Sequence, residues 1–198
     1  MPPLDRQQKD EIYRRTKAAV ERSVRTAGRD PADPAAMLGM CLEWAWEGYR
    51  TIKAWPDAPR TIIQAGSAQW PRIPEPMDDG VSPTHFAYEF QEDSHLVRLT
   101  LAGVVPVVQR HDGHVAASLP ELHVWLGCPE TQEIIDFTTG CWPATCKATT
   151  GLEWFAKPPP EYLWCRGDMR PDGANYRPSR KAIELVSLIL QRQERRYP

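Results

Sequence analysis

The sequence LHVWLG at residues 122–127 is followed, after a short gap, by EIIDFT at residues 133–138. Both segments are rich in β-branched, aromatic and other apolar residues, which is typical of β-strands. The stretch between them contains Pro129 and polar residues, which favour a turn. The two segments therefore predict a β-hairpin that carries His123 on one strand and Asp136 on the other.

The length of the connecting loop decides whether His123 and Asp136 share a face of the hairpin. A four-residue loop, PETQ, pairs the two residues that flank it and places Asp136 opposite Trp125. Because side chains alternate along a strand, His123 and Trp125 share a face, and Asp136 then lies diagonal to His123 at about 7 Å. A two-residue loop would place Asp136 directly opposite His123. A loop of odd length would put the two residues on opposite faces.

Helical periodicity marks both ends of the chain. Apolar residues recur at helical spacing in three segments that we expect to form helices, at residues 4–27, about 34–54 and 179–193. Gly28 can end the first helix, and Ser179 can act as the N-cap of the last. Gly39 can interrupt the second helix, so that a new helical segment begins close to Cys41.

Further strands are expected between the helices, at residues 61–66, 85–90 and 96–108. Pro106 favours an edge position for the last of these strands. Residues 140–160 read as a loop. Together these segments predict an α+β fold, an antiparallel sheet at about 60–138 with flanking helices, followed by a C-terminal loop and helix at 140–198. A chain of 198 residues is expected to form a single domain, 1–198.

The composition is that of an ordinary globular protein, with 41% hydrophobic residues, 25% charged residues and a formal net charge of −2. This charge favours neither nucleic acid nor an anionic membrane as a partner, and basic runs such as Arg14-Arg15 read as solvated helix faces. No apolar run is long enough to span a bilayer, and no secretory signal is visible at the N-terminus. Five cysteines without repeated spacing favour free thiols. We therefore expect a cytoplasmic protein without nucleic-acid or membrane partners.

Three residues supply the groups of a thiol acyl-transfer site. A nucleophilic cysteine must be partly thiolate, although the pKa of free cysteine is about 8.5, and a neighbouring imidazole or a helix N-terminus lowers that pKa. An aspartate can hold the imidazole in the required orientation. Cys41, His123 and Asp136 provide these groups. Each of these residues also has a purely structural interpretation: a buried thiol, a core histidine and an aspartate that caps a turn. The other four cysteines are competing candidates for the nucleophile.

Residues 39–54 and 122–138 resemble the transglutaminase-like branch of the papain-type cysteine enzymes. In that superfamily a cysteine begins a helix, a histidine lies on the next sheet strand, and an aspartate follows roughly a dozen residues later. The segment HVWLGCPETQEIIDFTTG is similar to this pattern, and GMCLEWAW is similar to the start of the nucleophile helix. The resemblance implies a papain/transglutaminase-like fold, with Cys41 as the nucleophile, His123 as the base and Asp136 as the group that orients it.

The same resemblance implies the activity. We expect a cysteine-dependent acyl-transfer enzyme of the amidase, peptidase (thiol protease) or transglutaminase type, which acts on a peptide, protein or amide substrate and needs no cofactor. The family's glutamine before the cysteine is absent from residues 35–40, so the oxyanion donor stays open between the Cys41 N–H, Gln64 and Gln69. A non-catalytic interaction protein with a transglutaminase-like fold and an unrelated α+β binding module are the alternatives. Substrate, acceptor and oligomeric state are left open.

Other residues with ligand chemistry are spread along the second half of the chain. A structural zinc site normally shows two tight pairs of ligands. The pairs present here are mismatched in type and spacing, so we expect no metal site; they involve His111, His114, His123, Cys128, Cys141 and Cys146. The eight tryptophans are expected either to line a substrate groove or to fill the core.

Overall fold

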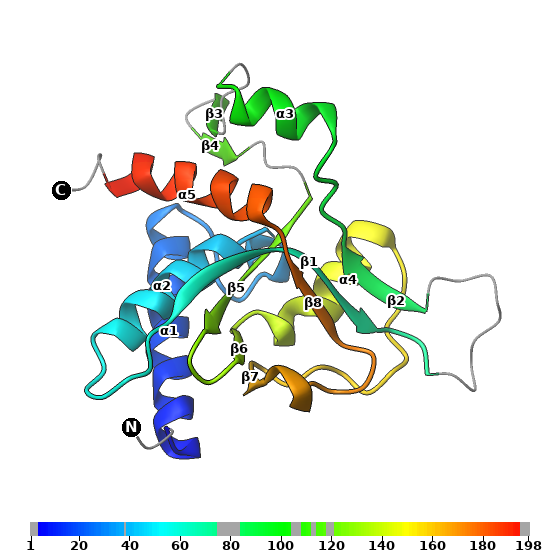
Figure 1. Cartoon of the computed structure of the whole chain (residues 1–198). Coiled ribbons are helices and arrows are strands. Elements are labelled where there is room, and N and C mark those ends of the chain that lie inside the picture. Colours follow the sequence, from blue (N-terminus) through cyan, green and yellow to red (C-terminus); the bar gives the residue numbers. More distant parts are fainter. Residues whose placement is uncertain are drawn as a thin grey trace. The chain divides into compact units, whose positions relative to one another are not determined.

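The computed structural model describes residues 4–37, 39–74, 84–103, 108–111, 114–117 and 121–194, which form a mixed α+β fold (Figure 1). The predicted α+β class is confirmed. The α-helices are α1 (Arg6–Thr26), α2 (Cys41–Lys53), α3 (His95–Leu101), α4 (Trp142–Thr150) and α5 (Arg180–Glu194). The strands are β1 (Ile62–Pro71), β2 (His85–Tyr88), β3 (Val108–His111), β4 (His114–Ala117), β5 (His123–Cys128), β6 (Glu133–Asp136), β7 (Leu163–Arg166) and β8 (Asn175–Pro178). Short 3-10 helices include η1 (Pro34–Met37) and η3 (Thr139–Cys141).

The larger sheet has the hydrogen-bonded order β2-β1-β5-β6-β7, with β8 paired to β1, and β3 and β4 form a separate two-stranded sheet. The chain divides into two compact units, and four of the strands pass from one unit into the other. The first unit comprises residues 1–63, 69–86 and 124–175, and the second comprises residues 64–68, 87–123 and 176–198. The expectation of a single domain stays a prediction.

The β5–β6 hairpin has the register that the four-residue loop predicts. Cys128 pairs with Glu133 and Leu126 pairs with Ile135 in an antiparallel arrangement. Continued by one pair, this register places Asp136 opposite Trp125, on the face that Leu126 and Ile135 do not share. On its other side β6 pairs with β7. The predicted parity of the hairpin is confirmed.

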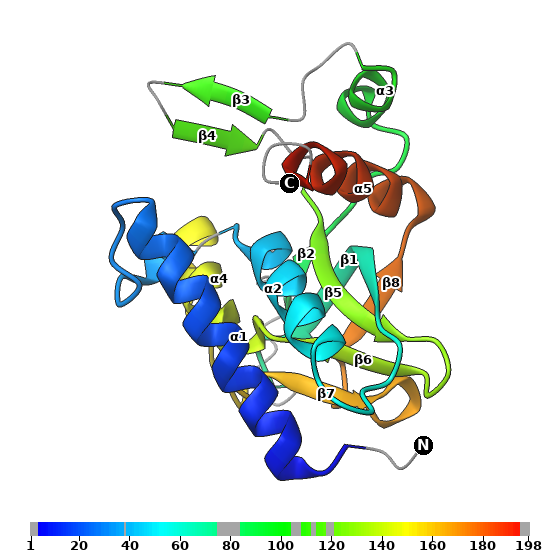
Figure 2. The ribbon, with the colours of Figure 1, turned by 90° about the vertical axis from the view of Figure 1, so that its left-hand side faces the viewer.

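Helix α1 begins at a capping box. The Asp5 carboxylate accepts a hydrogen bond from the Gln8 N–H at 2.8 Å, and the Gln8 side chain accepts one from the Asp5 N–H at 2.9 Å. The helix packs against α2, as Figure 2 shows. Its buried residues lie at helical spacing, which confirms the predicted amphipathic stripe; they are Ile12, Tyr13, Thr16, Val20 and Val24.

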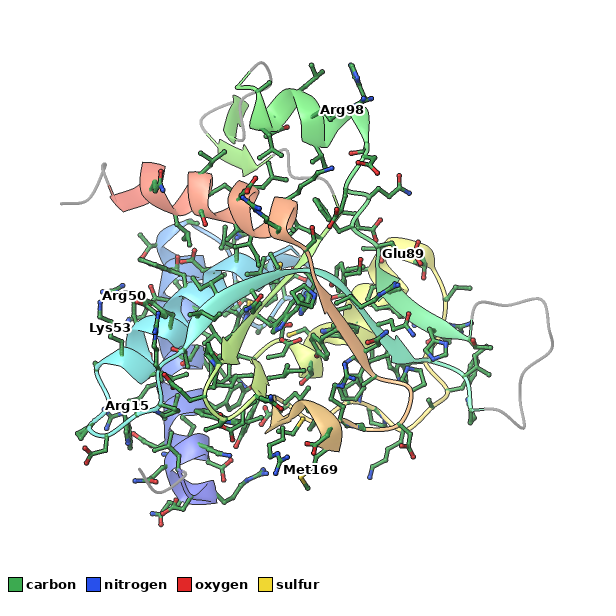
Figure 3. The ribbon with its side chains drawn as sticks, in the orientation of Figure 1. Arg15, Arg50, Lys53, Glu89, Arg98 and Met169 are labelled. Atoms are coloured by element: carbon green, nitrogen blue, oxygen red, sulfur yellow. The ribbon has the colours of Figure 1, made fainter. Side chains whose placement is uncertain are left out.

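The outer face of α1 and α2 is charged (Figure 3). Arg15 lies over the ring of Trp55 at 5.0 Å, and Lys53 lies over the ring of Tyr49 at 5.7 Å. Arg50 forms an ion pair with a glutamate one turn earlier on α2. Exposed pairs of this kind contribute little to stability, so this face is the solvated surface that the sequence predicts.

Helix α2 packs on the β5–β6 hairpin through Gly48. A Cβ at this position would overlap the ring of Phe137 and lie 3.4 Å from Leu126 Cδ1. Phe137 also contacts Tyr162, with ring centroids 6.2 Å apart. The absence of a side chain at Gly48 therefore lets the helix backbone approach the aromatic core of the first unit closely.

Two predicted elements are wrong. The strand expected at 96–108 is replaced by α3, because Ser94 caps a helix by accepting a hydrogen bond from the Val97 N–H at 3.2 Å and Val97 and Thr100 are buried on one face. Pro106 lies outside the described residues. The loop expected at 140–160 contains α4, which has a proline in its first turn and ends at Gly151 with φ +73°.

The second unit contains α3, α5 and most of β8. Ser179 caps α5 as predicted, since its Oγ accepts a hydrogen bond from the Ala182 N–H at 3.3 Å. Strands β3 and β4 form a hairpin in which His111 pairs with His114. No helix in the described part of the chain is long and apolar enough to cross a membrane.

Candidate functional site

Cys41 is the first residue of α2. Gly39 has φ +70°, a conformation that favours glycine, and it separates η1 from the new helix. The predicted break near Gly39 is therefore confirmed, and the continuous helix expected at about 34–54 is divided into two segments. Cys41 is half-buried. The N–H groups of a first helical turn form the positive end of the helix dipole, and Cys41 lies at this end of α2.

The middle of α2 lies beside the segment that follows β6. Gly48 packs on Phe137, which is the residue after Asp136. η1, which precedes Cys41, contacts α4, which begins at Trp142. Both contacts lie within the first unit, which holds Cys41 and Asp136.

Asp136 is 1% exposed and ends β6. Its Oδ1 accepts hydrogen bonds from the N–H and from the hydroxyl of Thr138, at 2.8 and 2.6 Å. The Trp142 Nε1–H donates to the Thr138 hydroxyl oxygen at 3.4 Å. Hydrogen bonds from donors to a carboxylate favour its charged form and fix its orientation. The turn-capping role that the sequence offered as an alternative for Asp136 is thus present.

Aromatic side chains surround this network within the first unit. Trp142 makes edge contacts with Trp70 and Phe86, with ring centroids 6.2 and 5.8 Å apart. Phe86 in turn contacts Trp154 at 6.5 Å. Trp70, Phe86 and Trp142 are all buried. Trp70 and Trp142 therefore fill the core of the first unit.

His123 belongs to the second unit and is 1% exposed. Its ring stacks on Tyr88, with centroids 4.9 Å apart and an interplanar angle of 18°, and it lies 6.3 Å from the ring of Tyr176. These contacts are those of a core histidine. Cys41 and Asp136 belong to the first unit.

The other four cysteines occupy environments that disfavour a thiolate or restrict access. Burial, and then the charge of Glu133, raises the pKa of the Cys128 thiol to about 11. Burial also raises the pKa of Cys141, with a further contribution from Asp136, and burial raises the pKa of Cys165. Cys146 is fully buried on α4. Of the five thiols, Cys41 is the one that lies at the first residue of an α-helix.

We expect Cys128 to be alkylated slowly. A thiol pKa of about 11, against an ordinary value of 9.0, leaves about a hundredfold less thiolate at pH 7.5 than in an unperturbed cysteine. The rate should rise with pH up to that pKa. Iodoacetamide labelling of each cysteine, followed by mass spectrometry, measures it. In urea, where burial is lost, Cys128 should react like free cysteine; equal rates in the folded and unfolded chain would contradict the prediction.

No group of three or more histidine, cysteine, aspartate or glutamate side chains in the described ranges could hold a metal ion. Comparison with protein-family models, with curated proteins and with solved structures gave no match. The transglutaminase-like resemblance therefore rests on residues 39–54 and 122–138 alone.

Thr138 and Arg72 make buried contacts, and neither residue belongs to the predicted site. A threonine two residues after an aspartate is a signal for a side-chain-capped turn, so Thr138 could have been found from DFT. Arg72 is buried and its Nη1 donates to the Glu153 carbonyl at 2.6 Å. Its own carbonyl accepts from the Phe155 N–H at 2.9 Å. Arg72 thus holds a loop that is distant in sequence, which no local pattern indicates.

Proposed function

We propose that this chain is a cysteine-dependent acyl-transfer enzyme with a transglutaminase-like fold, acting on amide or peptide bonds through Cys41, His123 and Asp136. The observation that carries the proposal is the position of Cys41 at the first residue of α2, at the positive end of the helix dipole. The hairpin register supports it, because His123 and Asp136 can share a face only if the loop has an even number of residues.

In the proposed reaction, the Cys41 thiolate attacks the carbonyl carbon of a peptide, protein or amide substrate. His123 takes the thiol proton and gives it to the departing amine, which leaves an acyl thioester on Cys41. Water or an acceptor amine then displaces the thiol. Asp136 orients the imidazole and stabilises the imidazolium. Positioned acid–base catalysis of this kind contributes roughly 10²- to 10⁴-fold, and no cofactor takes part.

The first turn of α2 also supplies donors for the oxyanion that forms at the attacked carbonyl. The N–H of Cys41 and the following N–H groups lack acceptors within their own helix. Donors aimed at a developing oxyanion are among the largest contributions to acyl transfer. A helix that begins at the nucleophile therefore serves both the thiolate and the tetrahedral intermediate.

A non-catalytic interaction protein is the second candidate, and two observations favour it. The His123 ring is buried against Tyr88, and Asp136 caps its own turn through Thr138. Both residues thus have structural roles that need no chemistry. The reactivity of Cys41 separates the two candidates.

We expect Cys41 to be alkylated by iodoacetamide at pH 6–7 faster than free cysteine and faster than the other four cysteines. His123→Phe removes the imidazole but keeps an aromatic ring beside Tyr88. This variant should lose roughly 10²-fold in the Cys41 rate, because the thiol then lacks its base. Rates for each site come from mass spectrometry of peptides sampled over time.

His95→Ala is the matched control, since His95 is an exposed histidine on α3 of the same unit. It should leave the Cys41 rate unchanged. A native chain in which Cys41 reacts no faster than free cysteine would exclude the catalytic proposal and leave the interaction protein in its place.

A further inference from the structure

One threonine makes two short hydrogen bonds to a single oxygen of Asp136. The Thr138 N–H and hydroxyl both donate to Oδ1, at 2.8 and 2.6 Å. Both residues are buried, at 1% exposure for Asp136 and 7% for Thr138. Charge-assisted bonds are shorter and stronger than bonds between neutral groups, and a buried carboxylate depends on them more than an exposed one.

A second hydrogen bond, from Trp142 to the Thr138 hydroxyl oxygen, leaves the hydroxyl proton of Thr138 available for Asp136. The Trp142 Nε1–H donates to Thr138 Oγ1 at 3.4 Å, and an indole N–H can only donate. The hydroxyl oxygen is the acceptor in that bond, so its single proton is available for Asp136. The Thr138 backbone is also fixed, because its carbonyl accepts from the Cys141 N–H at 2.8 Å at the start of η3.

From this geometry we propose that Thr138 is a positioning residue for Asp136. The inference rests on the proposed function. Two bonds to Oδ1 prevent rotation of the carboxylate and determine where Oδ2 lies. In the proposed triad Oδ2 is the oxygen that orients the His123 imidazole. Thr138 touches neither substrate nor thiol and acts only through the carboxylate.

The test is the pH profile of Cys41 alkylation by iodoacetamide between pH 5 and pH 9. Thr138→Val keeps the size of the side chain and removes the hydroxyl. Without this donor Asp136 stabilises the imidazolium less, so the thiolate–imidazolium pair forms only at higher pH. We expect the Cys41 rate at pH 6 to fall about tenfold and the acid limb of the profile to move to higher pH. Thr138→Ser restores the donor and should stay within about twofold of the native rate.

Thr145→Val is the matched control. Thr145 is a buried threonine on α4 whose hydroxyl donates to the Cys141 carbonyl at 3.0 Å. Its loss can lower the melting temperature, but it should not shift the pH profile. Thr138→Ala repeats the comparison if Thr138→Val does not fold.

The outcomes are distinguishable. Native Cys41 that reacts no faster than free cysteine overturns the proposed function, and the inference with it, before any Thr138 variant is made. Accelerated native Cys41 together with a Thr138→Val profile that superimposes on the native one overturns the positioning role alone. A shift in Thr138→Val that Thr138→Ser reverses and Thr145→Val lacks supports it.

Discussion

Gly66→Ala is expected to destabilise the protein by more than about 3 kcal/mol, at or beyond the upper end of the usual range for overpacking. A Cβ at Gly66 would overlap the carbonyl oxygen of Arg177 and lie 2.9 Å from the Ser179 N–H nitrogen and 3.1 Å from Pro178 Cα. All three are backbone atoms of β8 and its junction with α5. Backbone cannot change rotamer, so alanine can be accommodated only if β1 and β8 separate.

Separation of these strands also removes backbone hydrogen bonds. The Ser179 N–H donates to the Ala65 carbonyl at 2.8 Å, beside the substituted position. Urea unfolding followed by circular dichroism measures the loss. Gly167→Ala is the control, because its Cβ would lie 3.5 Å from the nearest atom, an ordinary contact. A Gly66→Ala midpoint as close to the native value as that of Gly167→Ala would contradict the packing described for β1 and β8.

Trp142→Ala is expected to cost about 3–5 kcal/mol in the first unit. The side chain is 1% exposed and contacts Trp70 and Phe86, and its indole N–H donates to Thr138. Its removal leaves a cavity that rigid aromatic neighbours cannot fill, and it withdraws a donor from the network at Asp136.

Thermal or urea unfolding measures this effect, and Phe155→Ala is the matched control. Phe155 is also aromatic and lies in the loop after α4, but it is 55% exposed. Surface substitutions of this kind usually change stability by less than about 0.5 kcal/mol. Similar losses of unfolding free energy in Trp142→Ala and Phe155→Ala would show that Trp142 does not lie in the core of the first unit.

The β5–β6 hairpin was predictable because its determinants are local. Apolar, aromatic and β-branched residues define both strands, and Pro129 with polar residues defines the turn between them. The loop length, and with it the register, was decided by the pairing of Cys128 with Glu133. The start of α2 at Cys41 was predictable for the same reason, since Gly39 supplies a conformation that ends one helical segment before the next.

Helix α3 was mispredicted as a strand because a short apolar segment does not distinguish strand from helix by pattern alone. Helix α4 was mispredicted as a loop because its sequence is rich in threonine and begins with Trp-Pro. In α3 the hydroxyl of Ser94 decides the outcome, and in α4 Gly151 and tertiary contacts with η1 do so. Strands β7 and β8 were not predicted at all. Each is four residues long, and β7 is extended because β6 provides its partner.

The sequence by itself indicated the α+β class, a hairpin at residues 122–138 and a helix start close to Cys41, because turn residues and strand-forming residues act between near neighbours. The structure decided among the loop lengths that the sequence left open. Only the tertiary structure showed that the Trp142 indole donates to Thr138, that His123 stacks on Tyr88, and that burial raises the pKa of Cys128, Cys141 and Cys165. Burial depends on where each side chain lies in the packed chain, and Tyr88 and His123 are far apart in sequence. Packing brings residues that are distant in sequence into contact, and the spacing of residues along the chain does not predict these contacts.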